Sequence, residues 1–234
     1  MTVIISAASV SQIVAGPGEE LQILQGIDVE IKAGDSVAIV GPSGAGKSTL
    51  LGLLAGLDVP TEGRIWLGGE ELTALDEDRR AALRARLVGV VFQSFLLLPG
   101  LTALENVMLP LELAGHRAPR RRAEEQLARV GLADRLGHTP RQLSGGEQQR
   151  VAIARAFVTT PAVLFADEPT GNLDSAAGER IIDLLFALNR DAGTTLVLVT
   201  HEPRLARRCR RQLTLAAGRL VADSDADPGQ GLPA

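Results

Sequence analysis

The segment Gly41-Pro-Ser-Gly-Ala-Gly-Lys-Ser48 restricts the possible folds of this chain more than any other segment. It matches the pattern G-x-x-x-x-G-K-[ST], follows the apolar run 37–40 and precedes the helix-like run 49–54. Glycines let successive N–H groups curl around phosphate oxygens, and the next helix presents its positive N-terminus to them. A glycine-rich turn that only starts a helix needs neither the lysine nor the hydroxyl. The segment therefore predicts a phosphate-binding loop in which Lys47 reaches the β and γ phosphates and Ser48 binds Mg²⁺.

Short apolar runs and alternating segments indicate an α/β fold. Four runs have the pattern of strands buried on both faces, as in a parallel sheet covered by helices: 37–40, 88–92, 163–166 and 196–199. Alternation in 27–31, which follows the run 21–24, predicts antiparallel β structure near the N-terminus, and 213–221, with Gly218 in the turn, predicts a hairpin. We therefore expect a mainly parallel core sheet flanked by helices, with an N-terminal antiparallel β subdomain.

The stretch between the apolar runs 88–92 and 163–166 is too long for a single crossover connection. Three parts of it have helical character: 102–113, 120–130 and 144–158. We expect a helical subdomain at about 94–160, inserted in one domain that spans 1–222. The Asp, Pro and Gly content of 223–234 predicts a flexible tail.

Bulk composition excludes several classes of protein. The 234 residues are 45% hydrophobic and 22% charged, which is ordinary for a globular protein. A net charge of −4 gives no indication of nucleic acid binding. The apolar runs are far shorter than the roughly 20 residues that cross a bilayer, and no leader opens the chain, so we expect a soluble protein made in the cytoplasm. The single cysteine, Cys209, cannot form an internal disulfide or a cysteine-based zinc cluster.

Two adjacent carboxylates, Asp167 and Glu168, follow the apolar run 163–166. A strand that ends in Asp-Glu-Pro is by itself more often a solvated turn, but a phosphate loop upstream reverses this preference. Asp167 is then predicted to hold Mg²⁺ through water, and Glu168 to polarise the attacking water. His201 ends the next apolar run and is predicted to lie near the γ phosphate, although a lone histidine at a strand end is usually structural or solvated.

The segment Leu143-Ser-Gly-Gly-Glu-Gln-Gln-Arg150 begins a predicted helix. Ser144 and Glu147 form an S-x-x-E capping box, which explains both residues as helix-start residues. A cap does not need Gly145 and Gly146, whereas two glycines, a hydroxyl and the N–H groups of a helix start make a second anion site. One triphosphate has no use for two such loops on the same side. We therefore expect the second loop to close over a nucleotide held by another copy of the chain.

Together these residues resemble the ABC transporter ATPase family. The likeness extends from the N-terminal strands to about Val221 and rests on the phosphate loop 41–48, Gln93, the signature 143–148, the acidic strand 163–168, the loop 171–174 and His201. Within the family, 91–99, 103–107 and 166–174 resemble the lipoprotein-release and macrolide-export group, and are most similar to its YbbA-like members.

The resemblance implies the P-loop NTPase fold of ABC ATPases and binding of ATP and Mg²⁺. The implied catalytic residues are Lys47, Gln93, Glu168 and His201. The implied nucleotide-binding residues are Gly41, Pro42, Ser43, Gly44, Ala45, Gly46, Lys47, Ser48, Thr49, Ser144, Gly145, Gly146, Glu147 and Asp174. The implied Mg²⁺ ligands are Ser48, Gln93 and Asp167.

The resemblance also implies partners and a location. Two copies close on two ATP molecules and drive an integral membrane permease by transmitting motion, for export or extraction of a lipid, lipoprotein or hydrophobic substrate. The chain does not bind nucleic acid and is held at the cytoplasmic face of the bacterial inner membrane through its permease. That permease is expected to dock on 93–107, where residues 95–98 are apolar.

Two alternatives share the same motor residues. An FtsE-like regulatory ATPase signals through a membrane partner, and only the identity of that partner separates it from a transporter. A soluble ABC ATPase of DNA repair or translation usually has long coiled coils, zinc-binding cysteines or a second motor, which this sequence lacks.

One position departs from the family pattern. Family members usually carry an aromatic residue that stacks on adenine, and the aligned position here is Val14 in a chain without tyrosine. Loss of the ring is expected to weaken base stacking, and with it the preference for ATP over GTP.

Overall fold

The computed structural model describes residues 2–16 and 20–224. The chain forms two compact units, Met1–Ala82 with Val197–Ala234 (unit 1) and Leu83–Leu196 (unit 2). The flexible tail is predicted at 223–234, but Asp223 is the last residue of a strand. Residues 225–234 of the predicted tail lie outside the described residues. The single domain at 1–222 with a helical subdomain at about 94–160 stays a prediction.

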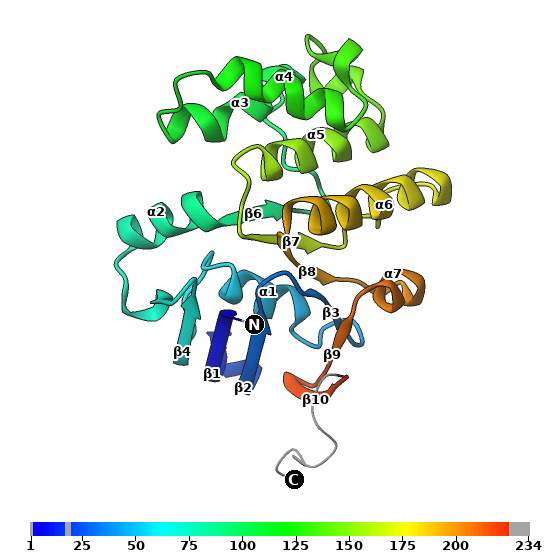
Figure 1. The fold of residues 1–234 in the computed structure, drawn as a ribbon. Helices are drawn as coiled ribbons and strands as arrows, with labels where there is room; N and C mark the ends of the chain where they lie inside the picture. The colour runs from blue at the N-terminus through cyan, green and yellow to red at the C-terminus, as the bar shows by residue number, and fades with distance from the viewer. Residues whose placement is uncertain (1, 17–19, 225–234) are drawn as a thin grey trace. The chain divides into compact units, whose positions relative to one another are not determined.

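Unit 1 contains most of the strands (Figure 1). Its strands are β1 (Val3–Ala15), β2 (Glu20–Lys32), β3 (Ser36–Val40), β4 (Glu62–Leu67), β5 (Glu70–Glu71), β9 (Arg211–Ala216) and β10 (Arg219–Asp223). Its helices are α1 (Lys47–Leu54), η1 (Leu72–Ala74) and α7 (Pro203–Arg208). Strand β8 (Thr195–Val199) begins in unit 2 and ends in unit 1, and α2 (Glu77–Leu87) begins in unit 1 and ends in unit 2.

The N-terminal β structure is a four-stranded antiparallel sheet in the order β2-β1-β4-β5. The predicted alternation on β2 is confirmed, because Ile27, Val29 and Ile31 are buried and the residues between them are exposed. The predicted hairpin of β9 and β10 is also confirmed, with Gly218 in its turn at φ 75°. Strand β9 pairs in parallel with β3 and antiparallel with β10, so the sheet that contains these three strands is mixed.

Unit 2 contains the predicted helical stretch. Its elements are β6 (Val88–Val91), α3 (Ala103–Leu113), α4 (Pro119–Arg129), η2 (Ala133–Arg135), η3 (Pro140–Gln142), α5 (Gly145–Phe157), β7 (Val163–Asp167) and α6 (Ser175–Ala192). Strands β6 and β7 pair in parallel, as their apolar runs predict. Helices α3, α4 and α5 lie together (Figure 1), and residues such as Val107, Leu127 and Val151 form one buried cluster between them.

The three helices predicted in unit 2 begin within one residue of their expected starts, whereas α1 begins at Lys47, two residues before the predicted run 49–54. Local chemistry explains two of the starts in unit 2. At α3, the Thr102 hydroxyl accepts a hydrogen bond from the Glu105 N–H at 3.2 Å, and the Glu105 carboxylate accepts one from the Thr102 N–H at 2.8 Å. Ser144 and Glu147 form the same capping box at α5, as predicted. A capping box satisfies two N–H groups that a helix start otherwise leaves without an intrahelical partner.

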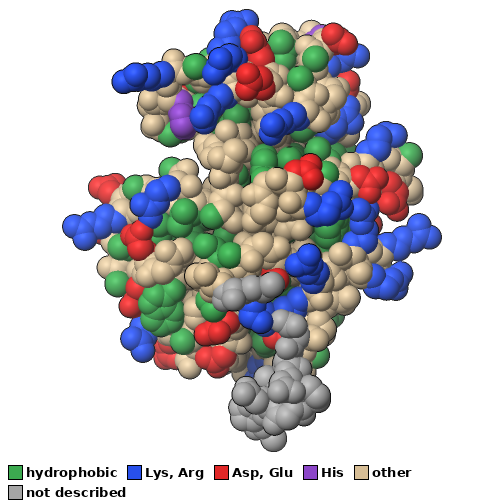
Figure 2. Space-filling model, in the orientation of Figure 1, with side chains coloured by type: hydrophobic (Ala, Val, Ile, Leu, Met, Phe, Trp, Pro, Cys, Tyr) green, Lys and Arg blue, Asp and Glu red, His purple; other side chains and the backbone are tan. Residues whose placement is uncertain are grey.

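The outer face of α4 carries charged side chains of both signs. Arg120 and Arg121 pair with Glu124 and Glu125, four residues later, at 2.8 and 3.8 Å. Figure 2 shows basic and acidic side chains interspersed on the visible face. Exposed ion pairs at this spacing add only about 0.3–0.5 kcal/mol each to stability. These side chains therefore form a solvated face of the helix and contribute little to its stability.

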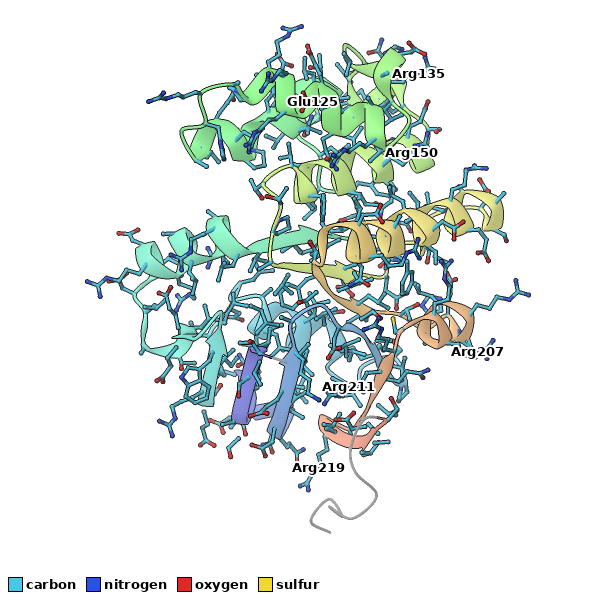
Figure 3. All side chains as sticks on the ribbon, in the orientation of Figure 1. Glu125, Arg135, Arg150, Arg207, Arg211 and Arg219 are labelled. Atoms are coloured by element: carbon cyan, nitrogen blue, oxygen red, sulfur yellow. The ribbon has the colours of Figure 1, made fainter. Side chains whose placement is uncertain are left out.

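A buried ion pair joins the ends of the C-terminal hairpin to β2. The Arg211 guanidinium donates to both carboxylate oxygens of Asp223, at 2.8 and 2.6 Å, and to the Glu30 carbonyl oxygen at 2.6 Å. Arg211 is only 8% exposed, and Figure 3 shows it on β9. The contacts that compensate the charge of Arg211 thus include the Asp223 carboxylate and the Glu30 carbonyl oxygen, both in unit 1.

Replacing Asp223 by alanine should lower the free energy of unfolding by about 3 kcal/mol, because the buried charge of Arg211 would lose the carboxylate that accepts two of its hydrogen bonds. The thermal midpoint, measured by calorimetry, should fall by roughly 6 to 12 °C. Glu125→Ala is the control, because the Arg121–Glu125 pair is 78% and 65% exposed. Equal shifts in the two variants would contradict the proposed stabilisation by the buried pair.

Candidate functional site

The phosphate loop of unit 1 connects β3 to α1 and is shaped by its glycines. Gly41, Gly44 and Gly46 have φ values of 146°, 78° and 93°. A side chain at Gly41 would place its Cβ 2.0 Å from the Leu215 carbonyl oxygen, and one at Gly46 would lie 2.9 Å from the Ile23 carbonyl oxygen. Only glycine fits at these two positions, so the backbone can curl closely there. The geometry is that of an anion-binding loop followed by a helix N-terminus.

Lys47 begins α1 and folds back over the loop. Its ammonium group donates hydrogen bonds to the carbonyl oxygens of Gly41 at 3.0 Å and Pro42 at 2.9 Å. Ser43 and Ser48 are exposed, and Thr49 is half-buried in the first turn of α1. The Ser48 hydroxyl that the sequence predicts for metal binding is therefore exposed, and the Lys47 ammonium lies against the backbone of the loop.

His201 lies beside the start of the phosphate loop in unit 1. The two share a cavity of about 310 Å³, whose lining includes Val40, Gly41, Thr200 and His201. The Thr200 N–H donates to the Ile39 carbonyl oxygen at 3.3 Å, which holds the end of β8 against β3. His201 is exposed. Unit 1 thus brings together the phosphate loop and the predicted histidine.

The acidic end of β7 lies in unit 2 and has an unusual backbone conformation. Asp167 is the last residue of β7, and Glu168 has a φ of 48° in the left-handed region that non-glycine residues rarely adopt. The Gly171 N–H donates to the Glu168 carbonyl oxygen at 3.0 Å, and the buried Gln149 side chain donates to the Pro169 carbonyl oxygen at 2.6 Å. Two hydrogen bonds therefore hold the turn in which Glu168 lies.

Gln93 lies next to the loop that follows this turn. A Cβ added to Gly171 would be 2.8 Å from the Gln93 side-chain nitrogen, which shows how closely the two residues approach. The Asn172 side chain donates to the Gln93 carbonyl oxygen at 2.9 Å. Unit 2 thus brings together the predicted glutamine, the loop that carries Asp174 and the turn that carries Glu168.

The signature segment and the loop before α6 line one polar cavity of about 320 Å³. Its lining comprises Ser144, Gly145, Gly146, Glu147, Arg150, Asn172, Leu173, Asp174, Ala177 and Arg180. Asp174 also caps α6, because its carboxylate accepts a hydrogen bond from the Ala177 N–H at 2.8 Å. Arg150 lies on α5 (Figure 3). The cavity thus combines the glycine pair at the N-terminus of α5 with two arginines, Arg150 of α5 and Arg180 of α6, and two acidic residues, Glu147 and Asp174.

The predicted capping box of Ser144 and Glu147 is present, and both residues also line this cavity. The Glu147 carboxylate accepts a hydrogen bond from the Ser144 N–H at 2.8 Å, and the Ser144 hydroxyl accepts one from the Glu147 N–H at 3.3 Å. The Ser144 N–H, then the Ser144 hydroxyl and then the Arg135 guanidinium lower the pKa of Glu147. Glu147 is therefore used to hold the segment in shape, and the glycines next to it remain available to line the cavity.

The base-binding position predicted at Val14 lies on β1 opposite Leu21 of β2. Val14 is 44% exposed and Leu21 is 64% exposed. The surface at the predicted base-binding position is therefore formed by two aliphatic side chains.

Sequence reasoning missed the residues that hold these loops by their backbone carbonyl groups. Gln149, Asn172 and Arg155 donate to the carbonyl oxygens of Pro169, Gln93 and the pair Phe95–Leu96. A side chain that binds a distant carbonyl leaves no signal in a local pattern. Gln149 lies in the segment 143–150 and Asn172 in the loop 171–174, but neither motif indicates which carbonyl group the side chain binds.

Among residues 2–16 and 20–224, no helix has the length and apolar character needed to span a membrane. The same residues contain no group of three or more His, Cys, Asp and Glu side chains that could hold a metal ion.

Comparison with known proteins identifies the family. The family model described as ABC transporter matches residues 24–171. The chain belongs to the ABC transporter family. This ABC-type ATPase is 57% identical over 212 residues to the uncharacterized ABC transporter ATP-binding protein YbbA of Escherichia coli (strain K12), with 89% of the chain and 93% of that protein covered. It is 52% identical over 208 residues to the lipoprotein-releasing system ATP-binding protein LolD of Pseudomonas syringae pv. tomato, with coverage of 88% and 91%.

The fold of the ABC-type ATPase matches solved cassettes. The dimeric structure of a post-hydrolysis state of the ATP-binding cassette MJ0796, bound to ADP and Pi, has a TM-score of 0.89 at 41% identity and covers 94% of this chain and 98% of that chain. A second dimeric structure of MJ0796 matches with a TM-score of 0.89 at 42% identity, covering the same 94% and 98%. The predicted family, fold class and ATPase activity are confirmed, including the likeness to YbbA and to the lipoprotein-release group.

Proposed function

We propose that this chain is the motor subunit of an ABC transporter. Two copies close on two molecules of MgATP and, at the cytoplasmic face of the bacterial inner membrane, drive an integral membrane permease by transmitting motion. The observation that carries this proposal is the polar cavity of about 320 Å³ at the N-terminus of α5. A helix N-terminus with a glycine pair suits the γ phosphate of a nucleotide held by the phosphate loop of another copy. The dimeric state of the MJ0796 cassettes supports the same arrangement.

The residues predicted to hold Mg²⁺ have the oxygen donors that this ion prefers. Ser48 is exposed in the first turn of α1, Gln93 is exposed after β6, and Asp167 is half-buried at the end of β7. When bound, Mg²⁺ would neutralise charge on the β and γ phosphates. The loop amides and Lys47 bind the phosphates themselves, and the hydrogen bonds of Lys47 to two carbonyl oxygens of the loop, which keep its ammonium beside the loop, support this role.

Hydrolysis requires that water be aimed at the γ phosphate and that a proton be accepted from it. Glu168 accepts that proton, and its left-handed backbone, with a φ of 48°, turns the chain directly after β7. His201 and Gln93 orient the reactants by hydrogen bonds. Asp174, Ser144, Gly145 and Gly146 of the second copy close the site and exclude water.

Glu168→Gln should slow ATP turnover by about 10² to 10⁴, because the amide cannot accept the proton. Binding of ATP should persist, and the variant should accumulate as an ATP-dependent dimer in size-exclusion chromatography with light scattering. Glu179→Gln, an exposed position on α6, is the matched control. Hydrolysis at the normal rate in the Glu168 variant would remove that residue from its role. Full activity of single subunits, with no second-order dependence on protein concentration, would contradict the shared site.

The docking surface for the permease is proposed on the segment after Gln93. Leu96, Leu98 and Leu113 are 53%, 44% and 81% exposed. A cavity of about 280 Å³ is lined by residues that include Leu109, Pro110 and Leu113 of α3 together with Arg155 of α5. Exposed leucines beside an apolar cavity are typical of a protein interface rather than of a solvated surface.

Polar side chains keep this segment in one shape. Phe95 and Leu96 both have positive φ, at 61° and 48°. The Arg155 guanidinium donates to their carbonyl oxygens at 3.0 and 2.7 Å. The fully buried Asn106 donates to the Leu98 carbonyl oxygen at 3.2 Å and accepts from the Leu98 N–H at 2.8 Å. A loop held in this way offers its leucines to a partner at little cost in ordering entropy.

Leu96→Asp should abolish copurification of the permease from detergent-solubilised membranes, because a charge would replace an apolar contact. Aspartate tolerates the left-handed conformation of this position, so the loop should keep its shape. Leu57→Asp, which is 45% exposed in unit 1, is the control and should retain the permease. Mass spectrometry identifies the captured protein. Equal recovery with both variants, or recovery of no integral membrane protein with the unchanged chain, would contradict the docking surface.

The substrate class is proposed from the relatives. LolD is named as part of a lipoprotein-releasing system, and the chain is 52% identical to it. A lipid, a lipoprotein or another hydrophobic substrate handled by the permease is the class that this likeness supports.

The aliphatic pair Val14 and Leu21 is proposed to contact the nucleotide base without stacking. Val14→Tyr should tighten ATP binding about two- to twelvefold, the equivalent of about 0.5 to 1.5 kcal/mol of aromatic stacking. Titration of ATP and GTP against both proteins measures the change and the selectivity. Val3→Tyr, on the same strand and 38% exposed, is the control. Unchanged affinities in the Val14 variant would place the base elsewhere.

A further inference from the structure

Gln149 lies in the middle of the signature helix α5 and is fully buried, at 0% exposure. Its side-chain nitrogen donates to the Pro169 carbonyl oxygen at 2.6 Å, across 20 residues of sequence. Its side-chain oxygen has no hydrogen-bond partner within the described part of the chain. The nitrogen therefore makes the hydrogen bond that fixes this amide.

The carbonyl that Gln149 holds belongs to the residue directly after Glu168. Glu168 has a φ of 48°, a conformation that costs a residue with a side chain about 1 kcal/mol or more and persists only when its surroundings enforce it. Two hydrogen bonds flank it: the Gly171 N–H donates to the Glu168 carbonyl oxygen at 3.0 Å, and Gln149 donates to the next carbonyl oxygen. Removing the Gln149 bond would free one side of this turn.

The N-terminal end of the same helix lines the signature cavity. Ser144 caps α5, and Gly145 and Gly146 form its first turn. Gln149 lies in the next turn, so a rigid piece of helix connects the cavity to the turn of Glu168. A small displacement of the helix start would therefore move the Gln149 amide with it, because hydrogen-bonded helices move as units.

We propose that Gln149 is a positioning residue that makes hydrolysis at one nucleotide depend on occupancy of the other. This inference rests on the proposed function, in which the signature cavity receives the nucleotide of the partner copy and Glu168 serves the nucleotide of its own chain. When the nucleotide of the partner copy binds in the cavity, it fixes the position of α5. Because Gln149 donates to the Pro169 carbonyl oxygen, the position of α5 then determines the position of Pro169 and of the neighbouring Glu168 carboxylate.

The test is Gln149→Met, which keeps the length and unbranched shape of the side chain in a buried site and removes the donor. Turnover of ATP by the full chain should fall about 10- to 100-fold, because the Glu168 carboxylate is no longer held in position toward the attacking water. The dissociation constant for ATP should change less than about twofold, because Gln149 holds no phosphate. The Hill coefficient for ATP should fall from near the limit of about 2 set by two sites to about 1.

Gln126→Met is the matched control. Gln126 is 5% exposed on α4, and its side-chain nitrogen has no partner among residues 2–16 and 20–224. The same substitution there removes a buried amide that holds no carbonyl. Turnover and the Hill coefficient should equal those of the unchanged protein, and the thermal midpoint should rise slightly.

The outcomes separate this inference from the proposed function. Unchanged turnover in Gln149→Met, with or without a lower thermal midpoint, would reduce Gln149 to a structural residue and overturn the inference. A fall in turnover with an unchanged Hill coefficient would overturn the link between the two sites. If the variant does not fold, Gln149→Asn, whose amide is too short to reach Pro169, is measured in the same way and decides between the same outcomes. Failure of Glu168→Gln to dimerise on ATP would instead reject the shared site itself.

Discussion

The close approach of Gly41 to the Leu215 carbonyl oxygen is the constraint on which the nucleotide-binding part of the structure depends. A Cβ at this position would lie 2.0 Å from that oxygen, so the chain can leave β3 in this direction only through glycine. The parallel register of β3 with β9 brings the carbonyl there. The curl of the loop, the start of α1 at Lys47 and the exposure of Ser48 all follow from this exit.

A second kind of interaction organises unit 2. Side-chain donors bind main-chain carbonyl oxygens of loops: Asn172 binds Gln93, Arg155 binds Phe95 and Leu96, and Gln149 binds Pro169. The bound residues lie in loops or turns, and three residues of these segments, Phe95, Leu96 and Glu168, have positive φ. Strained loops persist when fixed donors hold them. The conformations of the loops at Gln93 and Glu168 are therefore maintained by the helices and loops packed around them.

Local patterns in the sequence predict most of the elements of this fold, but not strand β1, helix α6 or the partner of β3. Strands 37–40, 88–92 and 163–166 and the helices at 102–113 and 144–158 appear close to their expected bounds, because burial on both faces and capping boxes act locally. Strand β1, with register shifts along its pairing with β2, does not alternate regularly and was not predicted. Helix α6 was also missed, since its cap, Asp174, was assigned to a functional loop. The parallel partner of β3 could not be predicted, because register is set between distant segments.

The sequence by itself determined the chemistry of this protein: the glycines, the lysine, the carboxylates and the order in which they occur, which together specify a family of ATPases. Those features are local, since an anion-binding loop needs only a short glycine-rich segment and a helix start. Only the tertiary structure decided which carbonyl groups the buried amides of Gln149 and Asn106 hold and which leucines stay exposed. The reason is that a buried donor takes the acceptor that packing brings within reach, however far away it lies in the chain.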